Sequence, residues 1–301
     1  MKHIVSVSIG SSTRNHKGTL ELMGEEIVLE RIGTDGDINK AVQIISELDG
    51  KVDAFGMGGI DLYLGGLDKQ YIFREAKKIA YAAKKTPLLD GTNLKMVIEP
   101  MAIDYAINVE KLPIEGKKVL MVCAVDRIAM AQAFEDYGCE VACGDLIFAL
   151  GISKEIKSVK TLRKIAKVLF PIISKLPFSW VYPSGTSQEN HDSHSKYAKF
   201  YLDKDVIAGD FHFLNKYLPA KIEDKIVMTN TVTSKDIEDI GRRGAKALVT
   251  TTPQVQGRAF GTNVIEAMLV ALIGKPVKEI SLSEYREMIT KLEIKPHIER
   301  Y

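Results

Sequence analysis

The most informative pattern in this 301-residue chain is the stretch KVLMVCAVDRIAMAQAFEDYGCEVACGD, from Lys118 to Asp145. An apolar run over 119–125 is followed by a polar break at Asp126 and Arg127, by apolar residues at helical spacing, and by a second apolar run over 141–143. This order predicts a strand, a turn, a helix and a second strand. A helix that joins two strands in this way makes them parallel, and nucleotide-like ligands bind at the carboxyl ends of such strands.

Alternating strands and helices are predicted over the rest of the chain as well. Short apolar runs alternate with segments of helical spacing: strands are expected at 4–9, 26–32, 225–229 and 247–249, and helices at 38–48, 71–84 and 264–273. We therefore predict an α/β fold, with a Rossmann-like, doubly wound parallel sheet and a separate N-terminal α/β lobe.

The length of the chain suits two domains of ordinary size. The segment PIEGKK, residues 113–118, has the composition of a linker. We expect an N-terminal, substrate-side α/β lobe over residues 1–115 and a Rossmann-like, cofactor-binding domain over residues 116–301.

The composition favours a small-molecule partner. Lys and Arg total 41 against 39 Asp and Glu, a formal net charge of +2, so no nucleic acid partner is expected. No apolar run approaches the ~20 residues that a membrane span needs, and we expect a soluble, cytoplasmic protein without a membrane partner. A homo-oligomer is compatible with the sequence. Three cysteines at strand positions favour core packing, His191 and His194 stand in a polar loop, and we assign no metal.

Polar residues follow five of the apolar runs. They are Asp126 and Arg127, Gly144 and Asp145, Asp210 and His212, Asn230 and Thr231, and Thr250 and Thr251. Because the carboxyl ends of parallel strands share one edge of a sheet, we expect these residues to line a single crevice.

A nucleotide-type cofactor, NAD or NADP, is expected in that crevice. The turn from Ala124 to Arg127 lacks the glycines of the dinucleotide fingerprint, so Arg127 and the following helix N-terminus would have to bind the anion. Asp145 is expected to accept the ribose hydroxyls, with a cap or loop carboxylate as the alternative. S-adenosylmethionine is the alternative cofactor because it presents the same ribose. Asn230, Thr231, Thr250 and Thr251 would line the crevice, although β-branched residues at strand ends explain the threonines equally well.

Three residues are candidates for catalysis. His212 follows the acidic Asp210 by two residues, which suits a general acid or base; a structural histidine is the alternative. Lys95 is the basic residue of its segment that could meet an anionic substrate, and a surface pair with Glu99 is the alternative.

The substrate is expected to carry a carboxylate. Gly58, Gly59 and Asp61 follow a predicted strand and would approach it from the N-terminal lobe, although a tight turn explains the glycines as well. Arg258 and Asn263 stand in a glycine-flanked loop before a helix, where the guanidinium and the helix N-terminus both favour an anion.

Four segments carry a resemblance to a known family: LERIGTDGD (29–37), AFGMGGIDLYL (54–64), TTTP (250–253) and GRAFGTNVIEA (257–267). Over its whole length the chain resembles a bacterial family labelled quinate 5-dehydrogenase. The resemblance implies a two-domain, Rossmann-like oxidoreductase that uses a nicotinamide cofactor, and no catalytic residue is carried over from it. An S-adenosylmethionine-dependent transferase and a non-catalytic small-anion binding protein remain alternatives.

Overall fold

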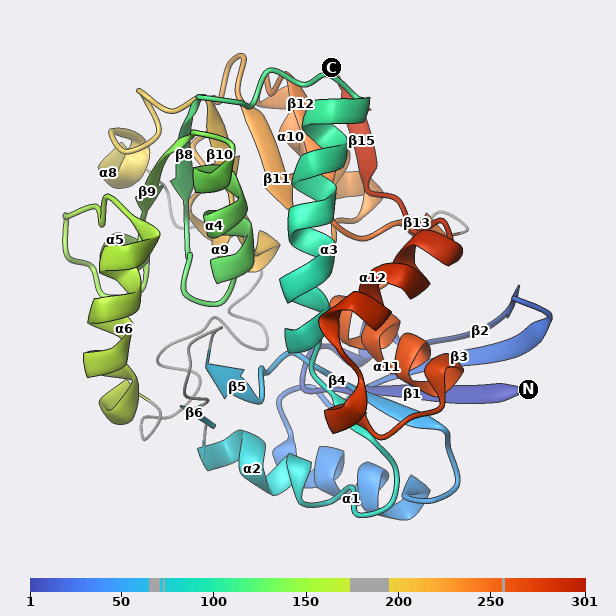
Figure 1. Ribbon diagram of the computed structural model, residues 1–301. Helices are drawn as coiled ribbons and strands as arrows, with labels where there is room; N and C mark the ends of the chain where they lie inside the picture. Colours follow the sequence, from blue (N-terminus) through green and yellow to red (C-terminus); the bar gives the residue numbers. More distant parts are fainter. Residues whose placement is uncertain (65–70, 73, 174–194, 256–257) are drawn as a thin grey trace.

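The computed structural model has two α/β lobes, each built on its own sheet (Figure 1). It describes residues 1–64, 71–72, 74–173, 195–255 and 258–301. Most strand pairs within the two sheets are parallel, and helices cover the sheet faces, so the predicted fold class is confirmed. None of the helices in these ranges combines the length and the apolar character that crossing a bilayer requires.

The first sheet contains five strands in the order β2-β3-β1-β4-β7. Their bounds are β1 Lys2–Ser8, β2 His16–Leu22, β3 Glu25–Gly33, β4 Ala54–Gly58 and β7 Leu88–Leu89. The central strand β1 is parallel to β3 on one side and to β4 on the other, whereas the edge strand β2 is antiparallel to β3. Because β3 and β4 lie on opposite sides of β1, the strand order reverses at β1. The carboxyl ends of β1 and β4 form an edge of the sheet that a ligand can reach.

Both faces of the first sheet are covered by helices. On one face α1 (Ile38–Leu48) and α2 (Arg74–Ala80) contribute to the core that contains Val5 and Val7 of β1. On the other face α3 (Thr92–Asp104), α11 (Thr262–Ile273) and α12 (Leu282–Lys291) pack around Ile4. The alternation of side chains along β1 thus matches a strand that is buried on both faces.

The second sheet contains six strands in the order β15-β12-β11-β10-β8-β9. Their bounds are β8 Lys118–Met121, β9 Glu140–Cys143, β10 Val206–Ala208, β11 Ile226–Thr229, β12 Ala247–Thr250 and β15 His297–Arg300. All neighbours are parallel except the edge pair of β12 with β15. The order of the strands reverses at β8, which lies between β9 and β10.

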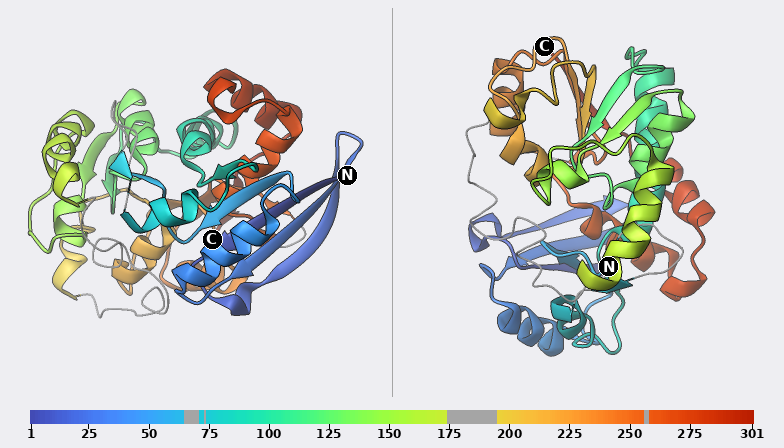
Figure 2. Two further views of the ribbon diagram at one scale, coloured as in Figure 1. Left: turned by 90° about the horizontal axis from the view of Figure 1, so that it is seen from below. Right: turned by 90° about the vertical axis from the view of Figure 1, so that its left-hand side faces the viewer.

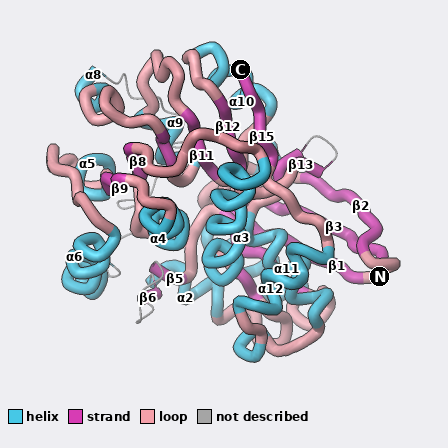
Figure 3. The backbone as a smooth tube through the Cα atoms, turned by 45° about the horizontal axis from the view of Figure 1, so that its top comes forward, coloured by secondary structure: helices cyan, strands magenta, loops and turns pink. Residues whose placement is uncertain are grey.

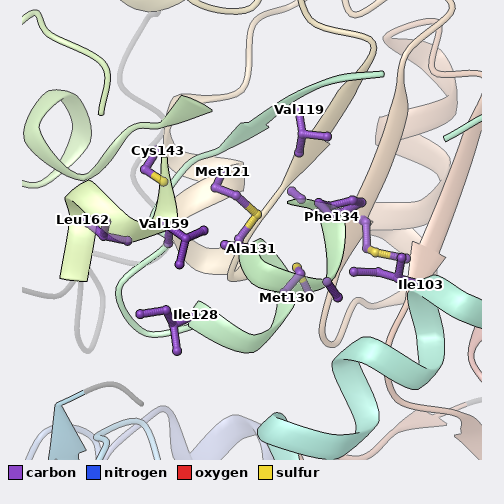
Figure 4. Close-up of a cluster of buried hydrophobic side chains, with 14 of the residues drawn as sticks. Ile103, Val119, Met121, Ile128, Met130, Ala131, Phe134, Cys143, Val159 and Leu162 are labelled. Atoms are coloured by element: carbon purple, nitrogen blue, oxygen red, sulfur yellow. The ribbon is translucent and has the colours of Figure 1, made fainter. Parts of the chain in front are cut away.

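The unit predicted from Lys118 to Asp145 forms as a strand, a helix and a strand. It consists of β8, α4 (Ile128–Asp136) and β9. Figure 4 shows the core formed by this unit, with Phe134 of α4 near Val119 and Met121 of β8. These three side chains are almost fully buried, which fixes α4 against one face of the sheet.

The remaining elements are short or lie at the periphery. They are the helices α5 Asp145–Phe148, α6 Val159–Ile173, α8 Ser195–Ala198, α9 Phe211–Tyr217 and α10 Ser234–Arg242, the 3-10 turns η1 Ser12–Arg14 and η4 Val277–Glu279, the π-helical turn η2 Tyr105–Val109, and the two-residue strands β5 Tyr63–Leu64, β6 Tyr71–Ile72, β13 Gln254–Val255 and β14 Arg258–Ala259.

The chain crosses between the lobes three times. The first crossing follows α3, the second follows β12, and the third lies between α12 and β15. Figure 3 shows α11 and α12 beside β1 and β3 of the first sheet, and the right-hand view of Figure 2 shows the two lobes one above the other. The expected division into 1–115 and 116–301 stays a prediction. The helices α11 and α12, which it assigns to the second domain, pack on the first sheet.

Candidate functional site

A cavity of about 560 Å³ lies between the two lobes. In the first lobe its wall is formed by residues at the carboxyl ends of β1, β4 and β7, including Ser8, Gly59 and Asp90. In the second lobe the wall comes from the ends of β8, β10 and β11, including Arg127 and Asp210. The switch points of both sheets thus face one cavity, which is where α/β proteins bind ligands.

The structure brings together residues that the sequence assigned to different roles. Those that line the cavity are Gly58, Gly59, Asp61, Lys95, Arg127, Asp210, His212, Asn230, Thr231 and Asn263. Gly144, Asp145, Thr250, Thr251 and Asp126 are not part of its lining. The side chain of Arg258, together with His191 and His194, lies outside the described residues.

A buried ion network forms the floor of the cavity. Arg127, 2% exposed, donates from Nη1 to Glu99 of α3 and from Nη2 to Asp210 Oδ2 at 3.0 Å. Asp210 Oδ2 also accepts from Asn230 Nδ2 at 2.8 Å. Removing one partner of such a network leaves an uncompensated buried charge, which typically costs about 3–5 kcal/mol. Since Glu99 lies on α3, the network links the first crossing helix to the second sheet.

Lys95 faces the same cavity from the first turn of α3. Its Nζ forms an ion pair with Asp61 Oδ1 at 3.1 Å, so the expected surface pair with Glu99 is replaced by a pair inside the cavity. Burial alone would lower the pKa of Lys95, but the negative charges of Asp61, Asp126 and Asp90 outweigh burial and raise it. Lys95 is therefore a protonated hydrogen-bond donor at neutral pH.

Asp126 is a buried carboxyl next to this network. Both of its oxygen atoms are buried without a hydrogen-bond partner among the described residues. Burial raises the pKa of Asp126 to about 7, against the opposing effect of Arg127 and Lys95. The carboxyl can consequently gain and lose a proton near neutral pH, a property that is concentrated at functional sites.

His212 lies in the first turn of α9, whose N-terminus is capped by Asp210. Asp210 Oδ1 accepts a hydrogen bond from the backbone N–H of His212 at 3.0 Å. Burial lowers the pKa of the His212 imidazole, which is therefore neutral at pH 7. No hydrogen bond of the imidazole to any described residue is present, so the ring is available to a ligand in the cavity.

Asp145 is hydrogen-bonded to the chain's own backbone. Its carboxylate is buried and accepts hydrogen bonds from the backbone N–H of Ala124 at 3.1 Å and of Val125 at 2.9 Å. It thus holds the turn after β8, in agreement with the alternative of a loop carboxylate. The neighbouring Gly144 is covered by the Phe148 ring, which a Cβ at position 144 would meet at 2.5 Å.

The carboxyl edge of the second sheet differs from a usual dinucleotide-binding site. The turn after β8 contains no glycine, and the acidic residue at the end of β9 is engaged with the chain's own backbone. Thr250 and Thr251 are buried, and Thr250 donates to the carbonyl oxygen of Thr252 at 3.0 Å. Asp145, Thr250 and Thr251 therefore do not fit the usual mode of dinucleotide binding at this edge, although Arg127, Asn230 and Thr231 of the expected set line the cavity.

The glycines of β4 serve the approach of α11. A Cβ at Gly56 would lie 2.9 Å from Asn263 Nδ2 and 3.0 Å from the backbone oxygen of Asn263. Asn263 Nδ2 in turn donates to Ser6 Oγ of β1 at 3.0 Å. Close packing of α11 on the sheet explains Gly56, whereas Gly58 and Gly59 also line the cavity.

Comparison with protein families identifies the chain. Residues 93–301 match the family described as Domain of unknown function (DUF8754). The chain belongs to this family. Residues 3–90 match a second one, Domain of unknown function (DUF8753), and neither description names quinate 5-dehydrogenase. The curated proteins include no match.

Several solved structures are similar to this DUF8754 chain at low identity. Glutamate dehydrogenase from Thermus thermophilus is 12% identical with a TM-score of 0.41, over 97% of this chain and 73% of that one. Shikimate dehydrogenase from Aquifex aeolicus is 11% identical with a TM-score of 0.40, over 96% and 97%. The glucose-galactose binding protein GanP from Geobacillus stearothermophilus is 11% identical with a TM-score of 0.39, over 99% and 97%.

Sequence reasoning missed the buried partner of Arg127, Glu99, and two residues of the cavity lining, Arg14 and Arg31. Glu99 was considered only as a surface partner of Lys95, and Arg14 and Arg31 were not considered at all. A glutamate between the apolar residues of α3 is the sequence signal for Glu99, and an arginine between the apolar residues Leu29 and Ile32 near the end of β3 is the signal for Arg31. Lys95, Arg127, Asp210 and His212 fall in the DUF8754 match, whereas Arg14 and Arg31 fall in the DUF8753 match.

Proposed function

We propose that the protein is an enzyme that binds a small hydroxy or oxo acid in the cavity and exchanges a proton with it. A single observation carries the proposal: a protonated amine, Lys95, and a neutral imidazole, His212, line the same cavity from opposite lobes. One group can donate to a ligand oxygen while the other accepts a proton.

The two groups have distinct roles in this proposal. Lys95, held by Asp61, donates a hydrogen bond to a carbonyl or hydroxyl oxygen and stabilises negative charge that develops there. In an oxo acid, His212 takes up a proton from the carbon next to the carbonyl group, and the electron pair moves onto the carbonyl oxygen beside Lys95. The protonated imidazole then returns the proton to the same carbon. Asp210 and Asn230 fix the start of α9 and thereby the position of the imidazole, and Asp126 adjusts the charge of the floor near neutral pH.

NAD(P)-dependent oxidation of such an acid is a more specific version of this proposal, and the family resemblance implies it. A nicotinamide cofactor would have to bind without the acidic acceptor at the end of β9, since Asp145 is engaged. S-adenosylmethionine meets the same obstacle. No step is assigned to either group.

A non-catalytic binding protein is the second candidate. It is favoured by the pairing of both floor cations, because Lys95 and Arg127 already have carboxylate partners. Because these ion pairs hold the donors and acceptors in fixed positions, the cavity can recognise a ligand without reacting with it.

The test begins with a thermal-shift screen of small hydroxy and oxo acids, with NAD, NADP and S-adenosylmethionine as separate additions. Any acid that raises the Tm is then followed by NMR for exchange of its C–H protons with deuterium from the solvent, and by absorbance for reduction of NAD or NADP. We expect deuterium exchange in the wild type, its loss in His212→Gln with binding retained, and loss of binding in Lys95→Met.

Lys78→Met is the matched control, because Lys78 is an exposed lysine of the same lobe outside the cavity lining. It should bind the acid as the wild type does. Binding without exchange or reduction would favour the second candidate, and binding that is indifferent to Lys95→Met would place the ligand elsewhere.

A further inference from the structure

We propose that the mouth of the cavity holds an oxyanion of the ligand, a carboxylate or a phosphate, between the guanidinium groups of Arg14 and Arg31. The inference rests on the proposed function only for the location of the ligand, since both concern the same cavity. It assigns the anionic end of the ligand to the first lobe.

Arg31 carries a charge that no carboxylate neutralises directly. It lies on β3, where its Nη1 donates to the carbonyl oxygen of Ser11 at 3.0 Å and its Nη2 to Ser8 Oγ at 3.2 Å. Both acceptors are uncharged, and no ion pair to a described residue is present. Asp35 acts on it only from a distance and accepts from the backbone N–H of Ser12 instead. Arg31 is thus fixed in place by neutral groups while its charge remains uncompensated.

Arg14 adds a second charge beside the first. It ends the η1 turn, is exposed, and lines the cavity. Its guanidinium makes no hydrogen bond or ion pair within the part of the chain that the structure describes. Arg14 and Arg31 line the same cavity, and burial together with the positive charge of Arg14 lowers the pKa of Arg31. An oxyanion between them would relieve this repulsion and would meet two planar donor groups.

The floor of the cavity has the opposite character. The carboxyl groups of Asp61, Asp90 and Asp210 line it, beside the two cations Lys95 and Arg127. An anion is therefore disfavoured at the floor, whereas hydroxyl groups of a ligand find acceptors there. The cavity consequently suits a molecule with hydroxyl groups at one end and an oxyanion at the other.

Space beside Arg31 is kept open by a glycine. A Cβ at Gly10 would lie 3.3 Å from Arg31 Nη2 and 3.2 Å from Ser8 Oγ. Gly10 itself lines the cavity, and its backbone N–H donates to Ser8 Oγ at 3.1 Å. A larger side chain at this position would crowd the guanidinium on the side that a ligand needs.

Three probes that share one carbon skeleton test the inference: glycerol, glycerate and glycerol 3-phosphate. Binding to the full chain is measured by calorimetry at low salt. We expect at least one of the two anions to bind about tenfold or more tightly than glycerol, as one or two charge-assisted hydrogen bonds would give. Glycerate and glycerol 3-phosphate separate a carboxylate site from a phosphate site.

The anion preference should fall about tenfold in Arg14→Gln and remain in Lys51→Gln, an exposed charge change elsewhere in the same lobe. The exposed guanidinium of Arg14 makes no hydrogen bond or ion pair to a described residue, so this variant remains informative even if Arg31→Gln fails to fold. Equal binding of all three probes, no binding of either anion, or a preference unchanged in Arg14→Gln would overturn the inference. Deuterium exchange that depends on His212 can persist in each of these cases, so failure here is distinct from failure of the proposed function.

Discussion

At the scale of single residues, the buried carboxylate of Asp145 binds the chain's own backbone. Asp145 satisfies the N–H groups of Ala124 and Val125 in the turn after β8. That turn also carries Arg127, so the carboxylate of Asp145 helps to set the position of the buried ion network. A carboxylate at the same position in a dinucleotide site would face the ligand instead.

Asp145→Ala should destabilise the protein. The substitution leaves one buried and one partly buried N–H group without acceptors, and each unsatisfied buried group costs about 1–3 kcal/mol, so we expect a loss of about 2–4 kcal/mol in the free energy of unfolding. Asp145→Asn should lose less, because its amide oxygen still accepts. Urea denaturation measures both, with the exposed Asp136→Ala as control. A loss in Asp145→Ala no larger than in the control would contradict the role assigned to the carboxylate.

At the scale of elements, α11 was recognisable from the sequence but its position was not. Its apolar run ends at Gly274, which adopts φ 70° as a helix terminator, and the cap of α1 by Asp37 is present as expected, with the Lys40 N–H at 3.0 Å. Such local signals depend on neighbours in the chain. The surface against which α11 packs depends on β1 and β4, which are more than 200 residues away. A helix buried on all sides has no polar face from which its partner could be inferred.

Gly56→Ala tests the packing of α11 on β4. The added Cβ would meet the backbone oxygen of Asn263 at 3.0 Å, so the helix must shift, and overpacking of this kind typically costs about 1–3 kcal/mol. Gly18→Ala on the edge strand β2 is the control, because its Cβ meets only the end of the His16 side chain. Thermal unfolding should show a clearly lower Tm for Gly56→Ala alone. Equal Tm values would mean that the contact can relax.

At the scale of the whole molecule, each lobe's part of the cavity could be predicted only in part. Gly58, Asp61 and Lys95 of the first lobe were among the expected residues, whereas Arg14 and Arg31 were not. Parallel connectivity alone brings Arg127, Asp210 and Asn230 to one edge, and sequence order reveals that connectivity. The opposite wall depends on how the lobes face each other, which no local pattern specifies. Arg31 was therefore missed although it lies inside a well-predicted strand.

The folded molecule should hold more protons than the unfolded chain at weakly acidic pH. Burial raises the pKa of Asp126 and of Glu266 to about 7, from the ordinary values 3.8 and 4.5. Groups with a raised folded-state pKa stabilise the protein below their unfolded pKa, and this contribution is lost as pH rises through the folded value. Stability should therefore decline between about pH 4.5 and pH 7.

Glu266→Gln isolates one of the two groups. Glu266 is fully buried, and its Oε1 accepts from Asn93 Nδ2 at 3.0 Å and from Tyr285 OH at 3.1 Å, contacts that an amide oxygen can keep. Relative to the wild type, the variant should gain up to about 3 kcal/mol between pH 4.5 and pH 8, because it has no charge to bury. Urea denaturation at both pH values measures the difference. If the free energy of unfolding changed with pH by the same amount in both proteins, burial of the ionised Glu266 carboxylate would not destabilise the fold.

Because the chain crosses between the lobes three times, the two matched regions depend on each other for folding. The DUF8753 match ends at residue 90, before the helices that cover one face of its own sheet, and those helices α3, α11 and α12 are encoded in the DUF8754 match. A gene segment for residues 3–90 alone would encode a sheet with that apolar face exposed to water. Separating the two regions would therefore remove both the apolar cover of the first sheet and one wall of the cavity.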